Sequence, residues 1–263
     1  MAVDVPVDHV LEIASPETCP FRASFLNDCS NCRRANGIIS VDENGVKRRY
    51  DTSACLKEMV YRHYIAQSGL EGIELKHTFE NAVIDKWNQR VYQYLQQWNW
   101  KSGEGIYIAA EKSNQNKLGN GTGKSYALHA LTHRLCREGV GCYYIRTVDF
   151  LQQLKESYEG RSMATETEIL ERYAKVPVLL LDDIGKENVR TEWAAERFYY
   201  LIDTRIRFER PTVYASNFLL SELEERFGLD NFGPAISSRI AGSCVLFTLG
   251  GPDRRLLRNA KTT

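Results

Sequence analysis

The stretch Leu118-Gly119-Asn120-Gly121-Thr122-Gly123-Lys124-Ser125 is a glycine-rich loop that ends in Lys-Ser. An apolar run at 106–110 precedes it as an expected strand, and 126–131 follows it as the start of an expected helix. Glycines lack a β-carbon and reach positive φ, so successive backbone N–H groups of such a loop can turn onto phosphate oxygens. The order of strand, loop and helix therefore predicts a Walker A phosphate-binding loop.

The side chains at the end of this loop have the chemistry that a bound nucleotide requires. Lys124 would neutralise the β- and γ-phosphates, and the Ser125 hydroxyl would bind Mg²⁺. The helix N-terminus adds a partial positive charge at the same place. We expect the nucleotide to be contacted by Gly119, Asn120, Gly121, Thr122, Gly123, Lys124 and Ser125.

The entrance of the loop departs from the strict pattern. That pattern has a glycine five residues before Gly123, and this chain has Leu118 there. Polar residues 111–117 also separate the expected strand from the loop. Because the phosphate-facing half is intact, we interpret Leu118 as an altered entrance to a working site. The alternative is a flexible turn that is followed by Lys-Ser by chance.

A second run, 176–183, reads Val-Pro-Val-Leu-Leu-Leu-Asp-Asp and ends in two carboxylates. Such an apolar run is typical of a strand buried on both faces, and open α/β sheets bind ligands at the carboxyl ends of their strands. Asp182 would hold Mg²⁺ through its water shell, and Asp183 would orient or deprotonate the attacking water. Two solvated acids at a strand end are the alternative, which the upstream loop disfavours.

Composition excludes some functions and leaves others open. The chain has 263 residues, enough for one large α/β domain and a small appendage, and its formal net charge is +0. Balanced charge gives no overall attraction to DNA or to a membrane surface, so any DNA contact must be local. No apolar run has the length of a membrane span, and no secretory signal opens the chain. We therefore expect a cytoplasmic protein with no membrane partner.

Four of the seven cysteines fall in the first quarter of the chain. Cysteines in a cytosolic chain are better explained by metal binding or burial than by disulfides. A Cys-x-x-Cys pair and a hairpin expected within 37–50 resemble a small module that needs Zn²⁺ to fold. The expected zinc ligands are Cys19, Cys29, Cys32 and Cys55. The alternative is a set of free thiols, with His9 and His63 as competing ligands.

Residues 67–72 interrupt the helical pattern and predict a domain boundary. We expect an N-terminal zinc-binding domain at 1–68 and an ATPase domain at 69–263, of which 69–100 form an entry linker and a helix. The helix is expected because apolar residues recur every three or four positions from Phe79 to Trp98.

Five apolar runs alternate with helical stretches along the rest of the chain. This alternation predicts an α/β fold with a parallel sheet between two layers of helices, preceded by the small zinc-binding α+β module. The expected strands are Ile106–Ala110, Cys142–Arg146, Val178–Asp182, Thr212–Ser216 and Cys244–Leu249.

Several blocks in one order resemble the DnaC/DnaI helicase loaders, an AAA+ ATPase family of bacterial or phage type that is related to IstB. The resemblance covers about residues 69–258. It is carried by Leu180–Glu187 with Thr191-Glu192-Trp193, by Arg210–Asn217, by Leu220-Ser221-Glu222-Leu223, by Ser237-Ser238-Arg239-Ile240 and by Gly251–Arg255.

The resemblance implies roles for three further residues. Asn217 matches the sensor that positions the attacking water. Arg239 matches the arginine finger, which reaches the γ-phosphate in a neighbouring subunit, so full activity would depend on self-assembly. Arg255 matches the second sensor, although the adjacent Arg254 leaves this register open. Taken alone, an asparagine at the Asn217 position is more often a turn residue, and Arg239 a surface ion pair.

The resemblance implies an ATP-dependent loader that delivers a hexameric DnaB-type replicative helicase onto DNA. ATP binding and Mg²⁺-dependent hydrolysis, stimulated by DNA or a partner, would switch assembly and release. The N-terminal domain would hold the helicase. Single-stranded DNA could contact the basic clusters at 47–49 and near Arg254 and Arg255, which are otherwise solvated surfaces. The alternatives are an IstB-type transposition helper ATPase and a nucleotide-binding module with little turnover.

Overall fold

The computed structural model of the 263-residue chain describes residues 39–41, 47–49, 54–114, 116–186, 191–228 and 232–259. Five parallel strands form its central sheet. They are β3 (Gly105–Ala110), β4 (Cys142–Arg146), β5 (Val178–Asp182), β6 (Thr212–Ser216) and β7 (Cys244–Leu249). The strand order is β4-β5-β6-β3-β7. The predicted parallel sheet is confirmed, and only β3 differs from its expected bounds, by one residue.

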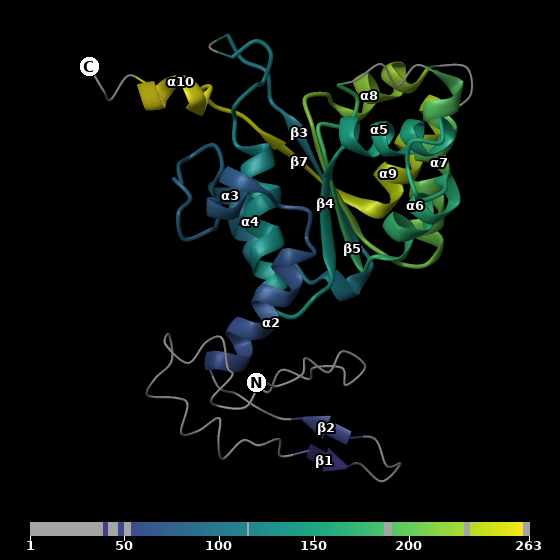
Figure 1. The fold of residues 1–263 in the computed structure, drawn as a ribbon. Coiled ribbons are helices and arrows are strands. Elements are labelled where there is room, and N and C mark those ends of the chain that lie inside the picture. The colour runs from purple at the N-terminus through teal and green to yellow at the C-terminus, as the bar shows by residue number, and fades with distance from the viewer. Residues whose placement is uncertain are drawn as a thin grey trace.

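Helices cover both faces of this sheet (Figure 1). On one face lie α3 (Gln89–Gln97) and α4 (Lys124–Arg137). The other face is covered by α5 (Thr147–Tyr158), α6 (Glu166–Lys175), α7 (Glu192–Arg207), α8 (Leu220–Phe227) and α9 (Phe232–Ser243). A short helix, α10 (Arg254–Asn259), follows the edge strand β7. In the part of the chain that the structure describes, no helix is long and apolar enough to cross a membrane.

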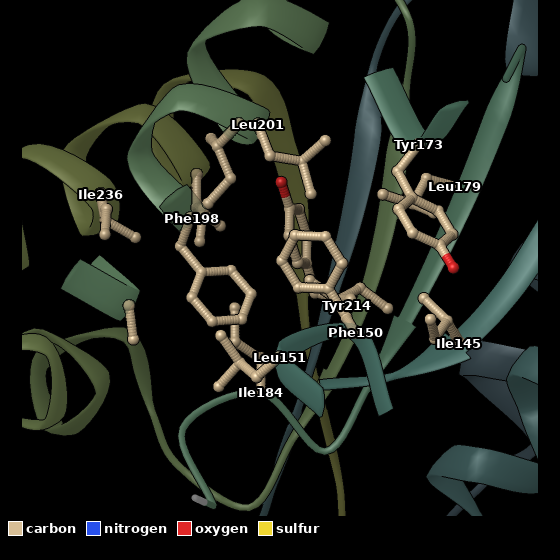
Figure 2. Close-up of a cluster of buried hydrophobic side chains, with 14 of the residues drawn as sticks. Ile145, Phe150, Leu151, Tyr173, Leu179, Ile184, Phe198, Leu201, Tyr214 and Ile236 are labelled. Atoms are coloured by element: carbon tan, nitrogen blue, oxygen red, sulfur yellow. The ribbon is translucent and has the colours of Figure 1, made fainter. Parts of the chain in front are cut away.

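The alternation of side chains along the strands divides the interior into two cores. In β5, Leu179 and Leu181 belong to one buried cluster, while Val178 and Leu180 belong to the other. Successive residues of a strand point to opposite faces, and both faces of this strand are covered, so the whole run is apolar. The core against α5, α7 and α9 is rich in aromatic rings, with Phe150, Phe198 and Tyr214 at its centre (Figure 2).

The helix expected from Phe79 to Trp98 is wrong in its first half. The helix α3 begins only at Gln89. Residues 79–88 are irregular, with turns at 80–81 and 86–88. In the second turn Asp85 N–H donates to Asn88 Oδ1 at 2.8 Å, and Asn88 N–H donates to Asp85 Oδ1 at 3.3 Å. Such short-range bonds compete with helix formation, and the apolar spacing alone does not reveal them.

The N-terminal quarter is described only in part. Strands β1 (Ile39–Val41) and β2 (Lys47–Arg49) pair antiparallel, which confirms the predicted hairpin. The helix α2 (Ala54–Ala66) follows and packs against α4, where the Tyr61 hydroxyl lies 2.8 Å from His133 Nδ1. Two short 3₁₀ helices, η1 (Gly72–Lys76) and η2 (Trp100–Ser102), flank the segment that leads to the sheet.

The zinc prediction lies outside the described residues. Cys19, Cys29 and Cys32 are not among them, and Cys55 is described only as a backbone position in α2. Within the described ranges, no group of three or more His, Cys, Asp or Glu side chains could hold a metal ion. The zinc-binding module is therefore not supported by this structure and stays a prediction.

Candidate nucleotide-binding site

The glycine-rich loop lies between β3 and α4 at the carboxyl edge of the sheet. Gly119, Gly121 and Gly123 all have positive φ, at 64°, 63° and 104°. A β-carbon at Gly119 would collide with Ala110, and one at Gly121 would collide with the Asp253 carboxylate. Glycine is therefore required at positions 119 and 121 for two reasons: the backbone has a positive φ, and there is no space for a β-carbon. Gly123 is the N-cap of α4, so the helix begins directly at Lys124.

The turn before the loop explains how the chain tolerates Leu118. Asn116 is buried, and its Nδ2 donates to the Asn120 carbonyl at 2.8 Å and to the Gly251 carbonyl at 3.1 Å. Its own carbonyl accepts from Gly119 N–H at 3.2 Å. These bonds hold the loop entrance, while the Leu118 side chain is 69% exposed and does not fill the cradle. The altered entrance is thus a different turn with its own bonding.

Lys124 is buried inside the loop that it follows. Its Nζ donates to the Gly119 carbonyl at 2.9 Å and to Thr122 Oγ1 at 3.3 Å. Burial lowers the pKa of Lys124 to about 8, against the opposing charges of Asp182 and Asp183. The loop therefore encloses an ammonium group whose present partners are uncharged oxygens. A bound phosphate would supply the anion that this group lacks.

The two predicted carboxylates lie at the end of β5 in different environments. Asp182 is 2% exposed, and burial together with the Asp183 charge raises its pKa to about 6. Its oxygens accept from Tyr144 OH at 2.9 Å and from Asp183 N–H at 2.9 Å. Asp183 is partly exposed, has a φ of 57°, and forms an ion pair with Lys186 at 3.0 Å. Positive φ in a non-glycine residue is costly and often marks a functional position.

Ser125 and Asp182 come together from separate elements, as a Mg²⁺ site would require. The Ser125 hydroxyl hydrogen-bonds to Asp182 and lowers the pKa of that carboxyl group. Hydroxyl and carboxylate oxygens are the ligands that Mg²⁺ accepts, usually with water and substrate phosphates completing the shell. The residues present therefore fit Mg²⁺ bound together with a nucleotide.

Asn217 follows β6, the neighbour of both β3 and β5. Its Nδ2 donates to Asn120 Oδ1 at 3.1 Å, so the side chain reaches the phosphate-binding loop directly. Ser216 stabilises the turn after it by accepting from Phe218 N–H at 3.1 Å. The structure thus brings Asn217 into the same site as the loop and the two aspartates.

Arg239 lies apart from this group. Its Nε donates to Asp203 Oδ1 at 2.9 Å and its Nη2 donates to Tyr199 OH at 2.6 Å, and both partners belong to α7. The guanidinium carbon also lies 4.4 Å from the centre of the Tyr199 ring. The Arg239 side chain is 33% exposed. None of these contacts involves the phosphate-binding loop of the same chain.

The two arginines near the C-terminus differ in their contacts. Arg254 donates through Nε to the Thr122 carbonyl at 3.1 Å, and its backbone N–H donates to the Gly121 carbonyl at 3.0 Å. Arg255 is exposed, although its charge contributes to lowering the Lys124 pKa. The predicted nucleotide contact by Arg255 is untested, and Arg254 is the residue that contacts the loop.

Three residues near the site carry no signal that the sequence alone would reveal. Tyr144 reaches Asp182, and Asn116 holds the loop entrance. Asp85 pairs with Arg254 at 2.7 Å. A resemblance across the Gly251–Arg255 block indicated that an arginine acts there, but not which of the two.

Comparisons with known proteins show an ATP-binding family. The sequence pattern of the family described as IstB-like ATP binding protein matches residues 80–262. A replicative helicase loader DnaI from Bacillus subtilis is 26% identical over 231 residues, which cover 82% of this chain and 69% of that protein. A putative insertion sequence ATP-binding protein from Sinorhizobium fredii is 28% identical over 138 residues, covering 52% of this chain and 54% of that protein.

Solved structures share the fold. A crystal structure of DnaI has a TM-score of 0.57 and 21% identity, covering 72% of this chain and 96% of that chain. An AMPPCP-bound DnaA from Aquifex aeolicus has a TM-score of 0.55 and 23% identity, covering 71% of this chain and 54% of that chain. The chain thus spans about half the length of the DnaA protein that it matches.

Proposed function

The chain belongs to the family of IstB-like ATP binding proteins, and we propose that it is an ATP-dependent helicase loader. It delivers a hexameric DnaB-type replicative helicase onto DNA in the cytoplasm. ATP binding and hydrolysis switch it between holding the helicase and releasing it. The matched relatives named as helicase loaders support this proposal at modest identity.

One observation favours a loader over other ATPases of the family. The match to the DnaI protein covers 82% of the 263 residues. That length is greater than the length of the segment from residue 80 to the C-terminus. It therefore includes residues that precede the family's ATP-binding region. The match to the insertion sequence protein covers only 52% of the chain. The loader likeness thus extends into the part of the chain that we assign to helicase binding.

In the proposed reaction, the described side chains bind ATP and direct a water molecule at its γ-phosphate. Lys124 holds the β- and γ-phosphates, and Ser125 and Asp182 hold the Mg²⁺ that neutralises phosphate charge. Asp183, at the exposed end of β5, orients or deprotonates the water, and Asn217 positions it. The bond from Asn217 to Asn120 supports this role, because it keeps the amide beside the loop.

Self-assembly completes the proposed site. Arg239 points its charge at Asp203 and Tyr199 of its own chain, on a partly exposed surface. In an assembly, the Arg239 side chain of one subunit would exchange these partners for the γ-phosphate of the next subunit. ATP hydrolysis would then be slow in the free protein and faster in the assembly, with DNA or the helicase promoting it.

We assign residues 1–68 to helicase binding and residues 69–263 to the ATPase domain. The cysteines Cys19, Cys29, Cys32 and Cys55 remain the proposed zinc ligands of the first domain. Elemental analysis of protein purified without chelator tests this assignment. About one zinc per chain is expected, and less than half an equivalent would overturn it.

The second candidate function is that of an IstB-type helper of transposition, which the family match and the insertion sequence relative also support. Co-purification separates the two candidates. A loader retains the replicative helicase of its own replication system, whereas a transposition helper retains a transposase and prefers duplex DNA. Retention of the helicase by full-length protein, lost when residues 1–68 are removed, supports the proposal. Equal retention of the helicase by full-length protein and by protein without residues 1–68 would contradict the helicase-binding role of the N-terminal domain.

A further inference from the structure

Tyr144 lies on β4, beside the strand that carries the two aspartates. The register of the parallel pair places Tyr144 opposite Leu180, two residues before Asp182. Tyr144 and Leu180 belong to the same buried cluster, so the ring lies on the face of the sheet that α4 covers. From there its hydroxyl donates to Asp182 Oδ2 at 2.9 Å, and the residue is only 4% exposed.

The Asp182 carboxylate is anchored through both of its oxygens. Oδ2 accepts from Tyr144, and Oδ1 accepts from the backbone N–H of Asp183 at 2.9 Å. A carboxylate held at both oxygens cannot rotate about its terminal torsion. Of the remaining lone pairs, the Ser125 hydroxyl uses one, and the others are free for a water molecule or a cation. Tyr144 therefore orients the carboxylate without occupying all of its acceptor capacity.

The Tyr144 ring is itself held from behind. His129 of α4 packs its ring against Tyr144 with centroids 4.6 Å apart and an interplanar angle of 77°. His129 is fixed in turn, because its Nδ1 lies 2.9 Å from His77 Nδ1 and the two rings stack. The hydroxyl thus reaches Asp182 from a rigid support that extends to the segment after η1.

We propose that Tyr144 is a positioning residue, which holds Asp182 in the orientation that receives Mg²⁺ bound with ATP. This inference rests on the proposed ATP-binding function. It makes the edge strand β4 necessary for Mg²⁺ binding, although β4 carries none of the site residues that were predicted from the sequence. Tyr144 acts through Asp182 and does not itself touch the nucleotide.

The test compares Tyr144→Phe with Tyr173→Phe. Tyr173 is also buried and also donates a hydrogen bond, to Gln153 Oε1 at 2.7 Å, but on the opposite face of the sheet. Each variant loses one buried hydroxyl and keeps its ring. The dissociation constant of a fluorescent ATP analogue is measured with Mg²⁺ and with EDTA, and the ratio of the two constants reports the benefit of the metal. Thermal unfolding confirms that both variants fold.

We expect the ratio of the dissociation constant in EDTA to that in Mg²⁺ to fall about tenfold in Tyr144→Phe. This is the effect expected for loss of a hydrogen bond to a charged group. Affinity in EDTA should stay unchanged, because Asp182 meets the nucleotide only through the metal. Tyr173→Phe should keep the wild-type ratio. A Tyr144→Phe ratio within twofold of wild type would overturn the inference and leave ATP binding intact. Wild-type protein that fails to bind the analogue with Mg²⁺ would instead overturn the proposed function and this inference together.

Discussion

Arg254 and Asp85 form an ion pair in which Nη2 and Oδ2 lie 2.7 Å apart. The same guanidinium donates to the Thr122 carbonyl of the phosphate-binding loop at 3.1 Å. One side chain therefore joins the turn before α3, the loop and the start of α10. Tyr92 of α3 adds a second link, because its hydroxyl donates to the Gly123 carbonyl at 3.2 Å. Two side chains thus connect the phosphate-binding loop to the segment from Asp85 to Tyr92.

Substitution of Asp85 should change ATP affinity through Arg254. Asp85→Asn removes the negative charge that neutralises Arg254, so the electrostatic potential at the loop becomes more positive. ATP affinity should rise by a factor of about three to five, in line with the modest worth of a partly exposed ion pair. Titration with a fluorescent ATP analogue measures the change. Weaker binding by Asp85→Asn would show that the pair supports the shape of the loop.

Asn217 should affect turnover more than binding. Asn217→Ala removes the amide that we propose to position the attacking water, so kcat should fall by about tenfold to a hundredfold. KM for ATP should change little, because the loop keeps its glycines and Lys124. Asn114→Ala is the matched control, since Asn114 is exposed in the turn before the loop. A loss in KM alone would assign Asn217 to loop structure, through its bond to Asn120.

Arg239 should act on the site of a neighbouring subunit. Arg239→Ala and Lys124→Ala should each be nearly inactive when assayed alone. For Arg239→Ala we expect kcat to fall by a factor of about a thousand, as for a missing arginine finger. A mixture of the two should regain part of the activity, because some sites then combine an intact loop with an intact Arg239. Steady-state ATPase assays on mixtures measure this. A mixture no more active than its components would contradict action between subunits.

Acid should destabilise the protein through His129. Burial, with the charges of His77 and His133, lowers the pKa of His129 to about 3 from an ordinary 6.5. The unfolded chain therefore binds this proton first, and the stabilisation present above pH 6.5 is lost as the pH falls toward 3. The loss is about 1.4 kcal/mol per pH unit in that window.

Comparison of wild type with His129→Gln isolates this effect. Below pH 6 the raised pKa of Asp182 works in the opposite direction, and Glu74 Oε1 lies 3.8 Å from His129 Nε2, so the difference in slope is the useful quantity. Urea unfolding from pH 7.5 to pH 5.5 should show a shallower loss in the variant, by about 1 kcal/mol. Equal slopes would mean that folding does not lower the pKa of His129.

Much of the fold follows from local patterns in the sequence. Each strand of the sheet is a short apolar run between helical stretches, and four of the five have the predicted bounds. The runs of β3 and β5 are the easiest to identify, because these inner strands are buried along their whole length and are almost entirely apolar. The first half of the expected helix at 79–98 was wrong, because Asp85 and Asn88 bond locally in a way that apolar spacing does not report.

The site is predictable where one segment supplies the chemistry. The loop from Gly119 to Ser125 is one contiguous segment, and Asp182-Asp183 is another. The residue types in each segment are enough to indicate phosphate binding and metal binding. Tyr144 was not predicted, because its bond joins residues 38 positions apart on neighbouring strands. Which of Arg254 and Arg255 contacts the loop also needed the structure, since adjacent helical residues differ by about 100° in direction.

Loading of the replicative helicase onto DNA tests the central claim most directly. The measurement counts helicase bound to a single-stranded circle coated with single-strand-binding protein, with wild-type protein or Lys124→Ala, in the presence of ATP. The exposed Lys117→Ala is the matched control. We predict that wild type and Lys117→Ala transfer the helicase and that Lys124→Ala does not. Transfer by Lys124→Ala at the wild-type level, or no transfer by wild type, would contradict an ATP-dependent helicase loader.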